Sequence, residues 1–246
     1  MYQIKVGMRI IGQNTIVPLS FDLSRYCHVM ITGSSGSGKS YALKYIFSSL
    51  LKYQNDLNIF CLDFKNSGFY SSWMDAEHMS SGKSCIDMLE QIYNKYIEIK
   101  EKNLSDKIVC ICDEYAAMVT WANNYDKKLG KKIMDMTSEM LMMGRCLNSN
   151  NGAVYIWTVL QRPDAAYFGS SRDNYFVKIV MGEVTRSIRT MLEIEEDSIP
   201  SEHIAKRGHG VMIIDDSIYA FIVPTYNMTY MDAMLKAKRS EAGSIA

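Results

Sequence analysis

The sequence predicts a single α/β domain in which helices flank a mainly parallel sheet. Apolar runs of strand length alternate with segments of helix length. The apolar runs do not alternate strictly between apolar and polar residues, as expected for strands that are covered on both faces. A length of 246 residues, 48% of them hydrophobic, suits one continuous core better than two. The predicted parallel strands are residues 28–32, 57–63, 107–113, 153–160 and 175–181.

Two hairpins are expected at the ends of this pattern. Alternating segments at 2–10 and 15–21 surround Gly12-Gln13-Asn14, which predicts an N-terminal β-hairpin packed on the core. A second pair, 210–215 and 218–223, is separated by Asp216-Ser217 and precedes a terminal helix. The expected boundaries are a hairpin at 1–26, the main domain at 27–240 and a frayed tail at 241–246.

Charge and cysteine content exclude several classes of protein. Lysine plus arginine number 27 and aspartate plus glutamate number 27, so any polyanion must be bound by a local patch. The six cysteines have no CxxC or Cys/His ligand spacing, which favours reduced thiols over a zinc site. No leader and no run of 18 apolar residues is present, so we expect a soluble cytoplasmic protein that reaches a membrane only through a partner.

One segment matches a phosphate-binding pattern. Residues 33–40, GSSGSGKS, fit G-x-x-x-x-G-K-[ST] between a predicted strand and a predicted helix. Such a P-loop directs backbone N–H groups and a helix N-terminus at phosphates, while its lysine reaches the β and γ phosphates and its last hydroxyl holds Mg²⁺. A flexible Gly/Ser turn is the alternative. The predicted contacts with ATP are Gly33, Ser34, Ser35, Gly36, Ser37, Gly38, Lys39, Ser40 and Tyr41, with Ser40 also on Mg²⁺.

A pair of acids ends the strand at 107–113. Asp113 is placed to bind the Mg²⁺ shell, and Glu114 to polarise a water for attack on the γ phosphate. Carboxylates at the tip of a buried strand are costly to desolvate, so a role with a cation explains them better than packing does. Without the upstream P-loop, a solvated strand end would explain the two acids equally well. Both acids are therefore predicted catalytic residues.

A polar residue ends the next predicted strand. Gln161 would lie near the γ phosphate as a sensor of hydrolysis if its strand adjoins the one that carries Asp113 and Glu114. An acid strand followed by a polar-ended strand is typical of P-loop ATPases that convert hydrolysis into movement. The sequence contains no NKxD base-recognition motif and no arginine-rich lid. A kinase or a small GTPase is therefore disfavoured.

Three motifs together resemble the FtsK/SpoIIIE family of DNA-translocating motor ATPases, within the FtsK–HerA superfamily. They are GSSGSGKS, VCICDEYAAM and GRCLNSNNGAVYIWTVLQRPDA, in that order, and the resemblance spans roughly residues 29–214. It implies a RecA-like P-loop NTPase fold, a homo-oligomeric ring that is a hexamer in the family, and double-stranded DNA in the central channel.

The resemblance also assigns roles to individual arginines. Arg145 corresponds to the family's arginine finger, which reaches into the neighbouring subunit's nucleotide site; a surface helix arginine is the alternative. Gln161 corresponds to the sensor. Arg162 and Arg172 correspond to positions that face DNA, where they would contact phosphates without reading sequence. For Arg172, a solvated loop charge is an equal reading.

Several departures from the family pattern keep other functions open. The threonine usual before Gln161 is replaced by Leu160, and the segment 120–132 after the acid pair is long, with four lysines that could face DNA or simply begin a solvated helix. Asp63 could position Lys65 near the nucleotide or a subunit interface, and an ordinary strand-end turn is an equal alternative.

The chain shows neither a membrane-spanning N-terminal region nor a winged-helix module, so it resembles the compact motors of Gram-positive mobile elements, with a membrane anchor or relaxase as partner. The rivals are a motor that moves protein, as in type VII secretion, and an ATP-dependent coupling or assembly switch with negligible turnover.

Overall fold

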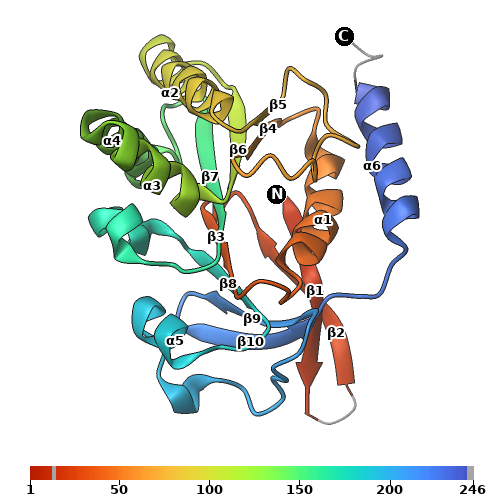
Figure 1. The fold of residues 1–246 in the computed structure, drawn as a ribbon. Coiled ribbons are helices and arrows are strands. Elements are labelled where there is room, and N and C mark those ends of the chain that lie inside the picture. Colours follow the sequence, from red (N-terminus) through yellow and green to blue (C-terminus); the bar gives the residue numbers. More distant parts are fainter. Residues whose placement is uncertain (13–14, 243–246) are drawn as a thin grey trace.

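The sheet of the computed structural model, which describes residues 1–12 and 15–242, follows the predicted order of elements (Figure 1). Its ten strands are arranged β2-β1-β10-β9-β8-β3-β7-β6-β4-β5. The strands are β1 (Gln3–Ile11), β2 (Thr15–Asp22), β3 (Val29–Thr32), β4 (Asn58–Asp63), β5 (Met79–Ser81), β6 (Lys107–Asp113), β7 (Ala153–Leu160), β8 (Val177–Met181), β9 (His209–Ile214) and β10 (Ser217–Ile222). The α-helices are α1 (Lys39–Leu50), α2 (Ser84–Lys102), α3 (Tyr115–Tyr125), α4 (Lys127–Met143), α5 (Arg186–Leu192) and α6 (Met228–Ala242).

The six strands from β8 to β5 form a parallel sheet, which confirms the predicted architecture. Every residue of β3 and β7 is buried, because helices cover both faces of the sheet at these central strands. β3 lies between β7 and β8, and β6 lies between β7 and β4. Since parallel strands present their carboxyl ends at one edge, the segments that follow β3, β4, β6 and β7 meet there.

The remaining strands extend the sheet in antiparallel fashion. β9 pairs with β8 and β10 with β9, and the predicted N-terminal hairpin joins through β1, whose Met8 and Arg9 lie opposite Ile222 and Phe221. Gly7 at this junction has no space for a side chain, because a Cβ would lie 2.5 Å from the carbonyl oxygen of Ile222. The hairpin therefore continues the sheet. Its predicted turn includes residues 13–14, which lie outside the described part of the chain.

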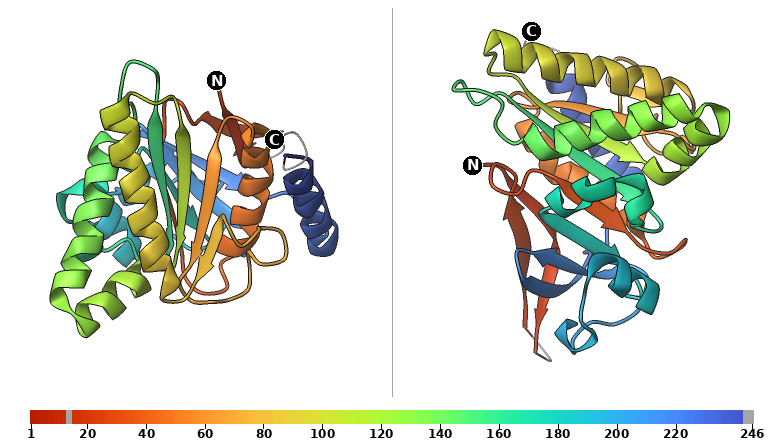
Figure 2. Two further views of the ribbon diagram at one scale, coloured as in Figure 1. Left: turned by 90° about the horizontal axis from the view of Figure 1, so that it is seen from above. Right: turned by 90° about the vertical axis from the view of Figure 1, so that its left-hand side faces the viewer.

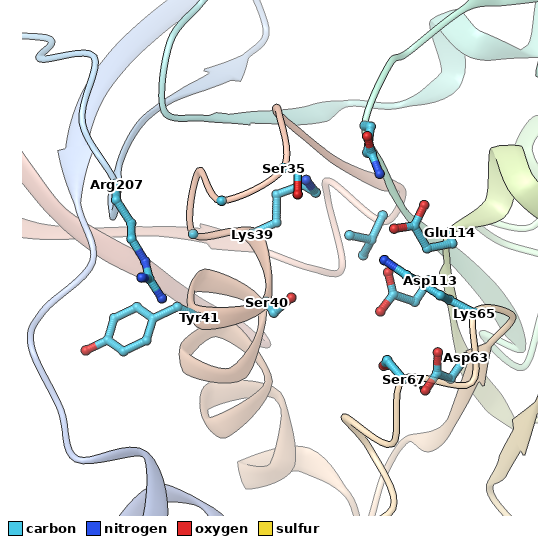
Figure 3. Close-up of a pocket in the computed structure, with 14 residues that line it drawn as sticks. Ser35, Lys39, Ser40, Tyr41, Asp63, Lys65, Ser67, Asp113, Glu114 and Arg207 are labelled. Carbon is cyan, nitrogen blue, oxygen red and sulfur yellow. Dashed lines mark hydrogen bonds between the residues drawn. The ribbon is translucent and has the colours of Figure 1, made fainter.

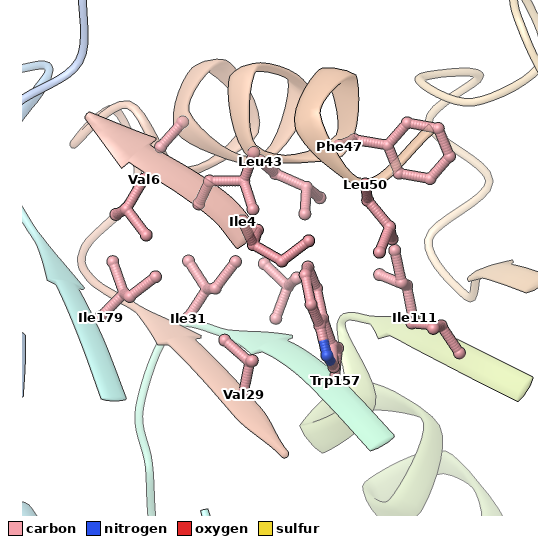
Figure 4. Packing of buried hydrophobic residues seen from close by; sticks show 14 of the residues in the cluster. Ile4, Val6, Val29, Ile31, Leu43, Phe47, Leu50, Ile111, Trp157 and Ile179 are labelled. Atoms are coloured by element: carbon pink, nitrogen blue, oxygen red, sulfur yellow. The ribbon is translucent and has the colours of Figure 1, made fainter. Parts of the chain in front are cut away.

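Two apolar cores occupy the two faces of the sheet. Figure 2 shows helices on both of these faces. On one face, α1 packs its buried Leu43, Phe47 and Leu50 over Ile31 and Trp157 (Figure 4). α6 lies beside α1 and contributes Met231 and Leu235 to the same core. The other face is covered by α2, α3, α4 and α5. Because both faces of the sheet are buried, the carboxyl ends of its parallel strands, where the segments that follow them meet, are held in a fixed position.

Two details differ from the sequence prediction. The short strand β5 was not predicted, because its three residues include two serines and offer no apolar run. The terminal helix α6 continues to Ala242, so the predicted tail begins within a helix, and its residues 243–246 lie outside the described part. Among the described residues, no helix has both the length and the apolar character needed to cross a membrane.

Candidate nucleotide site

The segment 33–40 forms a compact loop between β3 and α1. Gly33, Gly36 and Gly38 have φ of 145°, 79° and 101°, which are conformations that L-residues rarely adopt. A Cβ on Gly33 would lie 2.4 Å from the carbonyl oxygen of Met181. α1 begins at Lys39, and its first turn carries no acidic side chain. Its free backbone N–H groups and the positive end of its dipole therefore face the loop, as an anion site requires.

The side chain of Lys39 lies across this loop. Its Nζ donates to the carbonyl oxygens of Gly33 at 2.7 Å and Ser34 at 3.0 Å. Burial lowers the pKa of Lys39, while the nearby carboxylates of Glu114 and Asp113 oppose that shift. The ammonium thus lies on the loop, within electrostatic reach of the acid pair.

Asp113 and Glu114 mark the change from strand to helix. Asp113 is the last residue of β6, and Glu114 has a φ of 57° immediately before α3 begins at Tyr115. A left-handed conformation is costly for a glutamate and is often retained at functional sites. It ends the strand sharply, so that both carboxyl groups line the same cleft as Lys39 and Ser40.

The environment of Asp113 disfavours a bare negative charge. Burial, followed by the charges of Glu114 and Asp63, raises the pKa of Asp113 to about 7, although Tyr70 donates a hydrogen bond to its Oδ2 at 3.3 Å. A cation beside this carboxylate would remove that penalty, because an opposite charge favours the ionised form. With the Ser40 hydroxyl in the same cleft, the residues present fit Mg²⁺, which prefers oxygen ligands.

The structure adds a second strand-end acid to the cleft. Asp63 ends β4 directly opposite Asp113 and is 1% exposed. Its Oδ2 accepts hydrogen bonds from Ser67 Oγ at 2.9 Å and from the Gly68 N–H at 3.1 Å. Its Oδ1 is buried and has no hydrogen-bond partner among the described residues. Lys65 lines the cleft as well, so both residues lie beside the predicted nucleotide position, while the bonds to Ser67 and Gly68 form a strand-end turn.

Gln161 follows β7 and lies in the same cleft. β7 pairs with β6 in register up to Asp113 and Val159, which places Gln161 beside the acid pair as the sequence predicts. Thr32 Oγ1 donates to the Gln161 carbonyl at 3.1 Å and ties the end of β7 to β3. Val159, which lies in the stretch where the family pattern differs, also lines the cleft.

Together these segments enclose a cleft of about 220 Å³ (Figure 3). In Figure 3, Asp63, Asp113 and Glu114 lie to one side of the start of α1, while Tyr41 and Arg207 lie to the other. Arg207 had not been predicted, because it comes from the turn before β9 and reaches the loop only through tertiary pairing. The full lining is Ser35, Gly36, Gly38, Lys39, Ser40, Tyr41, Asp63, Lys65, Ser67, Asp113, Glu114, Val159, Gln161 and Arg207.

Three predicted arginines lie outside this cleft. Arg162 lines a neighbouring hollow with Glu114 and Gln161, and its Nη2 donates to Ser187 Oγ at 3.3 Å. The side chain of Arg172 is 15% exposed and donates to Glu193 Oε1 at 3.1 Å, so an acidic neighbour already binds it. Exposed Arg145 follows α4 near Lys107, at the amino ends of the parallel strands and thus at the opposite edge of the sheet.

Comparisons with known proteins agree with the family resemblance and with the fold. A model of the FtsK/SpoIIIE family matches residues 2–93. This match contains the P-loop and confirms the resemblance inferred from the motifs; it ends before Asp113, so the roles of the later residues depend on their positions in the cleft. No curated protein matches the chain.

Solved structures share the fold at low sequence identity. EssC (ATPases 2 and 3) from Geobacillus thermodenitrificans superposes with a TM-score of 0.72 at 12% identity, over 100% of this chain and 50% of that one. The pCW3 conjugation coupling protein TcpA, in monomer form with ATPgS, gives 0.67 at 20% identity, over 96% of this chain and 70% of that one. EccC (ATPases 2 and 3) from Thermomonospora curvata gives 0.62 at 15%, over 98% and 47%. The chain thus spans half the length of the EssC structure.

Proposed function

We propose that this chain is an ATP-hydrolysing motor subunit that moves double-stranded DNA, as a ring built from copies of itself. The observation that carries the proposal is the convergence of Lys39, Asp113, Glu114 and Gln161 in one cleft, from the segments that follow three neighbouring strands. The FtsK/SpoIIIE match and the ATPase neighbours support ATP hydrolysis. The conjugation coupling protein among those neighbours supports DNA transfer as the process.

In this proposal each side chain has a distinct task. Lys39 and the N–H groups of the loop bind the β and γ phosphates, and Ser40 with Asp113 would hold Mg²⁺, which supplies charge neutralisation on the transferring phosphoryl group. Glu114 accepts a proton from the attacking water. Gln161 donates a hydrogen bond toward the γ-phosphate position. When hydrolysis removes that hydrogen bond, the change in Gln161 is transmitted to Arg162, the next residue along the chain.

The decisive experiment measures ATP hydrolysis at several protein concentrations, with and without long double-stranded DNA. Stimulation by DNA that rises steeply with protein concentration supports a DNA motor completed by neighbouring subunits. Glu114→Gln serves as the inactive control, since it should bind ATP and fail to turn it over. Hydrolysis that is indifferent to DNA, together with weak and salt-insensitive DNA binding, would contradict the assignment of DNA as the moved polymer.

A second candidate is a motor that moves protein. It is favoured by the ion pair of Arg172 with Glu193 and by the equal numbers of positive and negative side chains, which leave DNA no broad positive surface. EccC, one of the structural neighbours, was solved with a signal sequence peptide. Stimulation of hydrolysis by a secreted protein's signal peptide, and not by DNA, would support this candidate.

A further inference from the structure

The nucleotide cleft has a second end that the phosphate chemistry leaves unused. The acids and Gln161 fix the γ-phosphate side, so a nucleoside triphosphate bound on the loop must extend its nucleoside away from them. Arg207 and Tyr41 lie in that direction (Figure 3). The guanidinium of Arg207 has no hydrogen-bond or ion-pair partner among the described residues, although it lines a cleft that contains three carboxylates.

The turn that carries Arg207 is fixed directly on the P-loop. The N–H of Gly208 donates to the carbonyl oxygen of Ser37 at 3.1 Å, and the N–H of Val223 donates to the carbonyl oxygen of Gly208 at 2.8 Å. A Cβ on Gly38 would lie 3.6 Å from Arg207 Cγ, so the arginine stem passes close to the loop backbone. The turn therefore holds the Arg207 stem in a set position beside the start of α1.

Tyr41 provides a rigid aromatic wall on the same side. Its ring stacks on Tyr226 at 4.0 Å between centroids and 11° between planes. The Tyr226 N–H donates to Tyr41 Oη at 2.7 Å, and Tyr226 Oη donates to the Tyr41 carbonyl at 2.6 Å. These reciprocal bonds join the first turn of α1 to the segment before α6. The wall is thus set before any ligand binds.

We propose that Arg207 is the nucleobase-binding residue of this cleft, with its guanidinium plane against the face of the base and the Tyr41–Tyr226 pair supporting that end. The inference rests on the proposed nucleotide site. A guanidinium is planar and weakly hydrated, which suits stacking on an aromatic ring. Stacking of this kind can contribute about tenfold to binding affinity. The phosphates need no second cation here, because in the proposed site Lys39 and the N–H groups of the loop bind them.

The test compares ligands that share phosphates and differ in the base. Affinities for Mg²⁺–ATP and for Mg²⁺–tripolyphosphate are measured by calorimetry for the wild type, Arg207→Ala, Arg207→Lys and Lys206→Ala. We expect Arg207→Ala to weaken ATP by about tenfold and tripolyphosphate by less than about twofold. Arg207→Lys should recover little of the ATP affinity, because lysine lacks the plane. Lys206→Ala, which removes the neighbouring exposed cation outside the cleft, should bind as the wild type does.

Other results would overturn the assignment. Equal losses for both ligands would make Arg207 a phosphate-binding residue, full recovery in Arg207→Lys would leave charge as its sole contribution, and no loss would remove it from binding. Lys39→Ala separates this inference from the proposed function, since it must weaken both ligands. A wild-type protein that binds neither ligand would contradict the nucleotide site itself. Thermal melting of each variant verifies that the substitution has not altered folding.

Discussion

Glu114, the proposed proton acceptor, has a left-handed conformation at the sharp change from β6 to α3. We expect Glu114→Gln to bind ATP with near wild-type affinity and to hydrolyse it about 10²–10⁴-fold more slowly, because the amide cannot accept the water's proton. Single-turnover hydrolysis with radiolabelled ATP measures this. Glu193→Gln is the matched control, since Glu193 also has a left-handed φ, of 58°, and lies outside the cleft. Equal slowing in both variants would show that backbone strain, and not proton acceptance, is responsible.

Asp113 links the same cleft to stability. Its pKa of about 7 in the folded protein exceeds the ordinary aspartate pKa of about 3.9, so the native state binds a proton more tightly than the unfolded state does. This carboxylate therefore costs no stability below about pH 4, and its cost grows as the pH rises to about 7 and is complete above that value.

We expect Asp113→Asn to be more stable than the wild type at pH 8, by roughly 1–4 kcal/mol, and nearly equal to it at pH 4. Urea denaturation at several pH values in the absence of nucleotide measures the difference in the free energy of unfolding. Addition of Mg²⁺ and a non-hydrolysable ATP analogue should narrow the gap at pH 8, because the cation stabilises only the ionised wild-type side chain. A stability difference that is independent of pH would contradict the raised pKa.

At the scale of elements, the loop between β3 and α1 depends on two different properties of glycine. Gly33 has a positive φ and also lies against backbone, with a hypothetical Cβ 2.4 Å from the Met181 carbonyl oxygen. Gly36 has a positive φ but open space around it. The two positions therefore separate strain from steric contact.

We expect Gly36→Ala to cost about 1–2 kcal/mol of stability, which is the usual penalty of a left-handed alanine. Gly33→Ala should cost clearly more and should also weaken ATP binding, since β3 and β8 must separate to admit the methyl group. Urea denaturation and calorimetric titration with ATP measure the two effects. Equal costs at both positions would show that the loop backbone shifts to accommodate the added atom.

The elements also show what sequence can and cannot predict. The parallel strands and the carboxylates at their ends could be predicted, because burial on both faces produces apolar runs and a polar residue at a strand tip interrupts them. On that basis the sequence predicts Asp113, Gln161 and the P-loop in one cleft. The position of Arg207 could not be predicted, because no local pattern indicates that β9 pairs antiparallel with β8 and brings the preceding turn onto the loop. Residue Asp63 remained ambiguous for a related reason: its buried position depends on the Ser67 turn.

At the scale of the whole molecule, Arg145 lies at the opposite edge of the sheet from its own chain's cleft. It can act in hydrolysis only in a neighbour's site, where an arginine would neutralise charge on the transferring phosphoryl group. We propose that Arg145 is this arginine finger, so Arg145→Ala should fold and bind ATP normally, yet hydrolyse it at least about 10³-fold more slowly. Activity at the wild-type level in the presence of DNA would contradict this role.

Mixing two inactive variants tests whether sites are shared between chains. In an assembly of Arg145→Ala and Glu114→Gln subunits, an Arg145→Ala cleft that faces a Glu114→Gln neighbour contains both Glu114 and Arg145. Random assembly of equal amounts should then restore roughly a quarter of the wild-type hydrolysis. A mixture of Lys39→Ala with Glu114→Gln is the control and should remain inactive, because both changes damage the cleft of the chain that carries them. Absence of recovery in the first mixture would contradict a site shared between chains, and the inactivity of Arg145→Ala would then come from lost surface packing beside Phe176, whose ring centre is 5.9 Å from Arg145 Cζ.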